Sequence, residues 1–169
     1  FLVPLMIEAE LDLYSTLLKE LLPTPAKSHY TFNLRDIASV VQGCLAANPK
    51  EVTEPPELLR LWLHENLRVF RDRLVDGADR EWFDAELRAL VPKYFKGDAF
   101  SKHDANADGV LQWEEVVHVD LSHLIYGDFM IPQADPRLYS EVKDTVKMVA
   151  VVEEYLEDYN ATNTKKMPL

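Results

Sequence analysis

The sequence has only one cysteine and no apolar run long enough to cross a bilayer. The single thiol, Cys44, excludes an internal disulfide, and its place in an apolar helical pattern predicts a buried, unreactive side chain. The apolar opening at residues 1–7 is too short for a membrane span, and Glu8 and Glu10 follow it at once. A single thiol makes the cytosol the expected compartment, and we expect no membrane partner. Because the chain opens without Met or the charged head of a signal peptide, we expect it to be a piece of a longer protein.

Positive charge is also scarce. The chain carries 18 Lys and Arg residues against 29 Asp and Glu residues, which gives a formal net charge of −11. Such a surface repels phosphate backbones and anionic lipid headgroups, and no basic stripe with interleaved aromatic residues offsets it. We therefore expect no nucleic-acid partner.

Glycine is rare, and the few glycines form no phosphate-binding loop. Only 5 are present, and none opens a Gly-rich loop followed by Lys and Ser or Thr, the arrangement whose backbone amides hold phosphates. An apolar strand ending in paired acids, which would hold magnesium and orient water, is missing as well. The fragment alone should therefore have no ATPase activity and no catalytic residue.

The sequence does contain helical periodicity over most of its length, with no long alternating strand pattern. The stretch from Gly97 to Asp135 is irregular, and Asp79 is expected to cap a helix that kinks or closes early at Pro92. These patterns predict an all-α helical bundle. The expected helices cover residues 4–21, about 34–47, 56–74, 79–90 and about 137–159.

The stretch 23–43 is the most informative one, because it combines a proline-rich turn, an extended run and a helix start. Asn33 is a preferred N-cap, and apolar residues follow it at helical spacing. This spacing leaves Arg35 in the first helical turn, where a cation opposes the helix dipole. Two interpretations stay open: Arg35 meets an external anion, or it pairs locally with Asp36.

This stretch, with Arg-Val-Phe-Arg-Asp-Arg-Leu-Val at 68–75 and Tyr-Gly-Asp-Phe-Met at 126–130, resembles the third AAA+ module of axonemal dynein heavy chains. The resemblance covers nearly the whole chain. It implies that Phe-Asn-Leu-Arg-Asp opens the small helical lid subdomain, and that Arg35 is the sensor-2 arginine facing the nucleotide phosphates. The phosphate loop and magnesium-binding acids would then lie in the large subdomain of the parent module.

The resemblance also implies a division of the chain and a setting for it. Residues 1–22 would form a helix connecting from the upstream large subdomain, 23–134 the helical lid, and 135–169 a helix and linker entering the fourth module. The parent would be an ATP-driven microtubule motor of the cytoplasm and of the ciliary or flagellar axoneme. Its ligands would be ATP or ADP with magnesium, and its partners neighbouring AAA+ modules, microtubules, and dynein intermediate and light chains.

Residues 104–115 fit the pattern of an EF-hand calcium loop at every required position. Hard oxygen ligands at this spacing select calcium or magnesium, and Gly109 allows the turn in the middle of the loop. The candidate calcium ligands are Asp104, Asn106, Asp108, the Val110 carbonyl, Gln112 through water, and Glu115 as the closing carboxylate.

The flanks of this loop leave a second interpretation open. Pro92 and Gly97 interrupt the entering helix, and no second loop is present to pair with this one. The loop is therefore either a calcium site or a relic whose Asx turns stand without metal. The alternative function for the whole chain is a small, acidic, helical calcium-binding regulatory protein. A third possibility is an inert helical scaffold.

The remaining polar residues are interpreted as structural. Arg68, Arg71 and Arg73 form a basic cluster in an acidic chain, and pairing with Glu65 and Asp72 on the same helix face is the simplest expectation.

Overall fold

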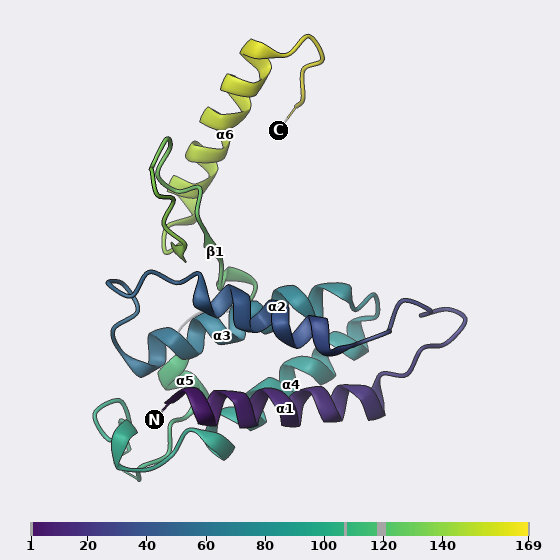
Figure 1. Cartoon of the computed structure of the whole chain (residues 1–169), viewed down its shortest axis with the longest axis vertical. Helices are drawn as coiled ribbons and strands as arrows, with labels where there is room; N and C mark the ends of the chain where they lie inside the picture. Colours follow the sequence, from purple (N-terminus) through teal and green to yellow (C-terminus); the bar gives the residue numbers. More distant parts are fainter. Residues whose placement is uncertain (1, 107, 118–120, 169) are drawn as a thin grey trace.

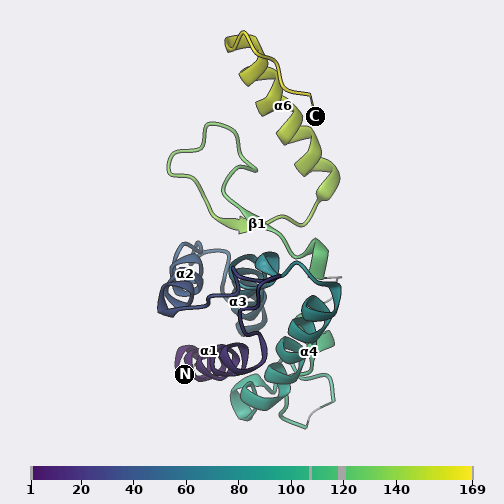
Figure 2. The same ribbon diagram turned by 90° about the vertical axis from the view of Figure 1, so that its right-hand side faces the viewer.

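Helices dominate the computed structural model, which describes residues 2–106, 108–117 and 121–168 (Figure 1). Four long helices form the body, and a further long helix, α6, projects away from it (Figures 1 and 2). The expected all-α class is confirmed. The long helices are α1 (Leu2–Glu20), α2 (Leu34–Leu45), α3 (Pro55–Val69), α4 (Gly77–Tyr94) and α6 (Thr145–Thr162). The short elements are η1 (Arg71–Arg73), η2 (Asp98–Phe100), α5 (Trp113–Val116), η3 (Leu121–His123), β1 (Tyr126–Gly127) and β2 (Ser140–Glu141).

Local capping chemistry sets where α2 and α3 begin. The Asn33 side chain accepts a hydrogen bond from the Arg35 N–H at 2.8 Å, and Asp36 accepts one from the Asn33 N–H at 2.7 Å. Helix α3 opens with two prolines, whose missing N–H groups are no loss in a first turn. The Glu57 carboxylate accepts from the Glu54 N–H at 3.1 Å. Both helices therefore begin within a residue of their predicted starts.

The start of α4 differs from the prediction. Asp76, not Asp79, is the N-cap, and its side chain accepts from the Ala78 N–H at 3.0 Å. Asp79 lies inside the first turn, where its carboxylate accepts from Lys27 Nζ at 2.5 Å and from the Tyr30 hydroxyl at 2.8 Å. The expected cap was wrong because partners about fifty positions away in the sequence occupy that carboxylate.

Two helix ends also differ from the prediction. Helix α3 ends at Val69, before the expected Leu74, and η1 makes the turn toward α4. Helix α4 runs through Pro92 to Tyr94, so it does not close early. A proline inside a helix costs about 3 kcal/mol. The buried face of α4, which packs into the core on both sides of Pro92, offsets that cost.

The hydrophobic core lies among α1, α3 and α4. The rings of Phe32, Phe70 and Phe83 follow one another with centroid distances of 5.8 and 6.4 Å. Helix α2 lies against α3 and buries Val40, while much of its remaining apolar surface stays partly open. Each fully buried large side chain contributes about 1.5–3 kcal/mol. Such side chains include Leu13, Leu17, Leu59, Leu63, Leu74 and Leu87.

A short strand pair joins the body to α6. Strands β1 and β2 are antiparallel, with Tyr126 opposite Glu141 and Gly127 opposite Ser140. Strands of two residues are too short to produce an alternating pattern, so the sequence could not reveal them. Within the described ranges, no helix is both long and apolar enough to span a membrane.

Helix α6 begins later than predicted. It starts at Thr145 rather than near Arg137, and Asp144 caps it by accepting from the Lys147 N–H at 3.0 Å. Residues 137–144 contain no helical turn, because they carry the bridge at Tyr139 and strand β2. Pairing with the body therefore overrides the helical pattern in this segment.

Candidate functional site

Arg35 lies on the surface in the first turn of α2. Its side chain is exposed, and among the described residues no ion pair or hydrogen bond engages its guanidinium. The neighbouring Asp36 is used elsewhere: Oδ1 lies 2.9 Å from Arg73 Nη1, and Oδ2 accepts the Asn33 N–H. The local pair between Arg35 and Asp36 is therefore not formed, and the guanidinium is available to an anion.

Arg73 fastens the extended lead-in to the start of α2. Besides Asp36, its guanidinium donates to the carbonyls of His29 at 3.3 Å and Thr31 at 3.1 Å. It also lies over the Phe32 ring, 4.9 Å from the centroid. One side chain from η1 thus holds the segment that positions Arg35.

Tyr30 fixes the same lead-in from its other side. The ring is buried, and its hydroxyl donates to Asp79 and accepts the Val75 N–H at 3.1 Å. Burial raises the pKa of Tyr30, and the Asp79 carboxylate adds to the shift. Because buried contacts hold this segment, the place of Arg35 does not depend on α2 alone.

The three basic residues at the end of α3 and in η1 are engaged with carboxylates. Arg68 pairs with Glu65, as expected, while Arg71 makes a bidentate pair with Asp84 at 2.6 and 2.9 Å. Arg73 pairs with Asp36. The expectation that Asp72 serves as a local partner is not met in these pairs, because the bend after α3 turns the arginines toward α2 and α4.

The EF-hand-like loop is stabilised by hydrogen bonds from its own backbone. Asp104 accepts from the N–H groups of Asn106 at 2.9 Å and Gly109 at 2.5 Å. Glu115 accepts from Ala105 through Oε1 at 2.6 Å and from Gln112 through Oε2 at 2.7 Å. The carboxylates therefore act as caps of backbone turns, the role that Asx-type turns fill without metal.

The surroundings of the loop are not those of a helix–loop–helix unit. The three-residue η2 precedes it, and the four-residue α5 begins inside it at Trp113 and ends at Val116, one residue beyond it. Asp108 accepts from the Val110 N–H at 2.8 Å, and Gly109 has a φ of 75°, as the predicted turn requires. Among the described residues, no three His, Cys, Asp or Glu side chains are grouped to hold a metal ion. The calcium ligand set stays a prediction.

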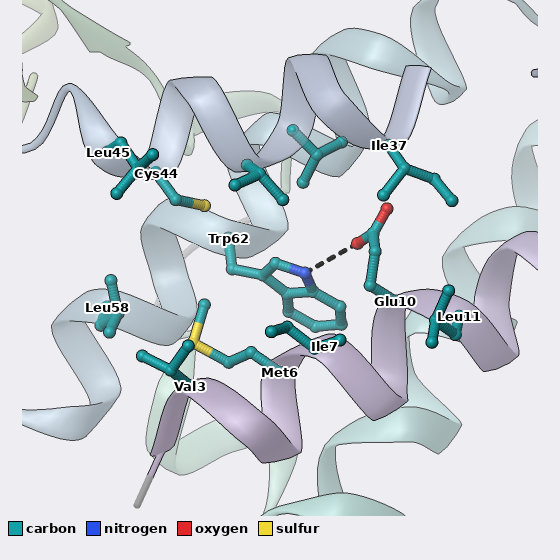
Figure 3. Close-up of a pocket in the computed structure, with 12 residues that line it drawn as sticks. Val3, Met6, Ile7, Glu10, Leu11, Ile37, Cys44, Leu45, Leu58 and Trp62 are labelled. Carbon is teal, nitrogen blue, oxygen red and sulfur yellow. Dashed lines mark hydrogen bonds between the residues drawn. The ribbon is translucent and has the colours of Figure 1, made fainter. Parts of the chain in front are cut away.

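A groove between α1 and α2 is a feature that we did not predict (Figure 3). It has a volume of about 280 Å³, and its lining is apolar except for Glu10. The signal was present in the sequence, because Val3, Ile7 and Leu11 repeat every four residues on α1 beside the stripe that enters the core. The lining residues include Val3, Met6, Ile7, Ile37, Val41 and Trp62.

Glu10 forms the polar part of this groove. Its Oε2 accepts from Trp62 Nε1 at 2.8 Å and from Asn66 Nδ2 at 3.0 Å (Figure 3). Burial raises the pKa of Glu10, and these two hydrogen bonds offset only part of the shift. Its Oε1 is buried and has no hydrogen-bond partner among the described residues.

Glu65 is a second buried carboxylate, and it connects three segments. It is fully buried on α3, lies against Gly43 of α2, and accepts from Arg68 Nε at 3.0 Å and from the Tyr139 hydroxyl at 2.6 Å. Burial raises the pKa of Tyr139, and hydrogen bonding to Glu65 raises it further. The segment before α6 is thereby fastened to α3.

Comparison with known proteins shows which protein family the chain is similar to. Residues 6–105 match the family model described as AAA+ lid domain. Dynein axonemal heavy chain 1 of Mus musculus is 46% identical over 164 residues, which are 97% of this chain and 4% of that protein. Its Homo sapiens counterpart is 45% identical over 166 residues, with 97% and 3% covered. Dynein axonemal heavy chain 12 of Mus musculus is 36% identical over 168 residues, with 97% and 5% covered. The chain thus spans a small fraction of these curated relatives.

Proposed function

Because the chain belongs to the AAA+ lid domain family and is similar over nearly its whole length to axonemal dynein heavy chains, we propose that it is the lid of the third AAA+ module of such a heavy chain, leading into the fourth. The parent chain is an ATP-driven microtubule motor that works in the cytoplasm and in the axoneme of cilia or flagella. Its ligands are ATP or ADP with magnesium. Its partners are the neighbouring AAA+ modules, microtubules, and intermediate and light chains.

Within that parent the chain has three parts. Residues 1–22 connect from the large subdomain, 23–134 form the lid, and 135–169 enter the next module. The family match over 6–105 and the projection of α6 away from the body support this division.

Arg35 is the sensor-2 residue of this lid. The observation that carries this proposal is an exposed guanidinium in the first turn of a 12-residue helix, beside an aspartate already paired with Arg73. A guanidinium presents a planar fork of donors that matches phosphate oxygens. The partial positive charge of the helix dipole at the start of α2 favours negative charge at the same place.

The contacts around Arg35 are suited to transmitting a force on its side chain to the rest of the lid. Arg73 ties the lead-in, α2 and η1 together, so a force on Arg35 acts on one packed unit. Rigid-body rotation of the lid about the module is the corresponding motion.

The test is Arg35→Ala in the full heavy chain, with Arg137→Ala as the matched control at an exposed arginine outside the body. Loss of one charge-assisted contact costs about 1.5–3 kcal/mol, which predicts nucleotide affinity at the third module about ten- to a hundredfold weaker. Equilibrium binding of a fluorescent nucleotide, with the main hydrolytic site blocked, measures it. Unchanged affinity in Arg35→Ala would defeat the assignment.

The calcium-binding alternative is not favoured. The loop carboxylates accept hydrogen bonds from backbone N–H groups, the helical segment before the loop has three residues, and the four-residue helix at its end extends only one residue beyond it.

A further inference from the structure

Several large apolar side chains are exposed together on the face of the molecule between α1 and α2. Ile7 and Leu11 are each 50% exposed, and Val41 and Leu45 on the facing helix are 42% and 78% exposed. These residues line one groove, so the apolar surface is contiguous. Contiguous patches of this kind mark places where another molecule packs.

A buried acid in this groove indicates which chemical group the other molecule must carry. Glu10 is 4% exposed, and two N–H donors share its Oε2. Its Oε1 is buried without a partner among the described residues, and Figure 3 shows it extending from α1 toward the side of Ile37 on α2. A buried acceptor without a donor is costly, so its partner is expected to come from whatever fills the groove.

We propose that the groove is the docking site of an amphipathic helix whose apolar face carries one lysine or arginine that reaches Glu10. A groove between two antiparallel or crossing helices accepts the apolar face of a third helix, and Glu10 selects a basic donor on that face. The remainder of the parent heavy chain supplies this helix, a source that rests on the proposed function. The curated relatives extend far beyond the 3–5% of their length that this chain spans.

Two other occupants fit less well. A second copy of this chain would bring another buried carboxylate and a surface of net charge −11 against the same groove. An apolar ligand with an anionic head would place its charge beside Glu10. The second copy sets like charge against like charge, and the anionic ligand brings an acceptor where a donor is needed.

The experiment uses the full heavy chain with a benzophenone amino acid in place of Val41, and Val75 as the control position. Val75 is a 60% exposed valine that does not line the groove. After irradiation and digestion, mass spectrometry identifies the attached peptide. We expect Val41 to yield one amphipathic peptide of the same polypeptide that contains Lys or Arg. A peptide from another polypeptide, a peptide without a basic residue, or a yield no higher than at Val75 overturns the proposal.

Glu10→Gln tests the role of the acid in that crosslinkable chain. The amide keeps an oxygen for Trp62 and Asn66 but removes the charge, so we expect crosslinking to fall at least tenfold. Leu11→Glu puts a charge on the exposed rim of the groove and leaves the core intact, so it should lower the crosslinking yield as well. It replaces Glu10→Gln as the test if Glu10→Gln destabilises the folded chain. Full yield in both variants contradicts the proposal. These variants are read out by crosslinking and Arg35→Ala by nucleotide binding, so failure of the docking proposal can be distinguished from failure of the proposed function.

Discussion

Replacing Gly43 with alanine separates helix propensity from packing, because the two predict opposite signs. Gly43 lies inside α2, where alanine is favoured over glycine by about 0.5–1 kcal/mol. In the structure, however, a Cβ at this position would overlap the Glu65 carboxylate, and even Oε1, the farther oxygen, would lie only 2.6 Å away. The contact is too close for any real carbon atom, so Glu65 or α2 must move.

The cost follows from what holds Glu65 in place. The carboxylate is fully buried and accepts from Arg68 and from the Tyr139 hydroxyl, so moving it weakens a buried, charge-assisted network. Overpacking costs about 1–3 kcal/mol, and full loss of a partner to a buried charge costs about 3–5 kcal/mol. After the gain in propensity, we expect Gly43→Ala to lower the free energy of unfolding by about 2 kcal/mol. The midpoint of thermal unfolding should fall by about 4–8 °C.

Urea unfolding of the 169-residue chain, followed by circular dichroism, measures this change. Gly77→Ala is the control, because a Cβ there meets nothing within 4 Å, and its stability should stay within about 0.5 kcal/mol of the parent. In a Glu65→Ala background the obstruction is gone, so Gly43→Ala should become stabilising by about 0.5–1 kcal/mol. A Gly43→Ala chain as stable as the parent would refute the packing argument.

Three further predictions concern single side chains. Burial raises the pKa of Cys44 to about 12, so a disulfide reagent near neutral pH should modify the native thiol on the order of a thousandfold more slowly than the unfolded one; equal rates contradict this. The pKa of Glu10 is raised above its ordinary value of 4.5, so its contribution to stability is full below that pH and is lost as pH rises through the raised pKa. Unfolding measured from about pH 4 to about pH 8 should show a smaller loss of stability in Glu10→Gln than in the parent, and parallel curves contradict it. In calorimetric titration with calcium, any heat from the parent should vanish in Glu115→Ala, and a silent parent refutes the calcium prediction.

The helix starts that the sequence predicted correctly are those whose chemistry is local. Asn33 caps α2 through hydrogen bonds within three residues, and the prolines that open α3 act through their own φ angles. Asp79 was expected to cap α4 by the same rule. That prediction was wrong because Lys27 and Tyr30, from the lead-in to α2, bind the Asp79 carboxylate, and no local sequence pattern contains that information.

In the candidate site, too, the features set by local sequence could be predicted and those set by distant residues could not. The position of Arg35 in a first helical turn followed from spacing alone. Whether Asp36 neutralises it depended on Arg73, which lies 37 positions further along the chain and reaches Asp36 only because the chain bends after α3. The groove between α1 and α2 needed the relative placement of two helices. The repeat at Val3, Ile7 and Leu11 gave only the hint that α1 has a second apolar face.

Helix α3 is the element through which these parts meet. Its Glu65 binds Tyr139, its Arg60 lies 3.3 Å from Glu141 of β2, and its His64 contacts the Leu124 carbonyl at 2.9 Å. Two of these contacts hold the segment just before α6 and the third holds the residues just before β1, while Glu65 also lies against Gly43 of α2. The side chains that connect α2 to the base of α6 are therefore buried or half-buried and come from a single helix. Since packed elements of this kind move as units, a displacement of α2 would carry the base of α6 with it.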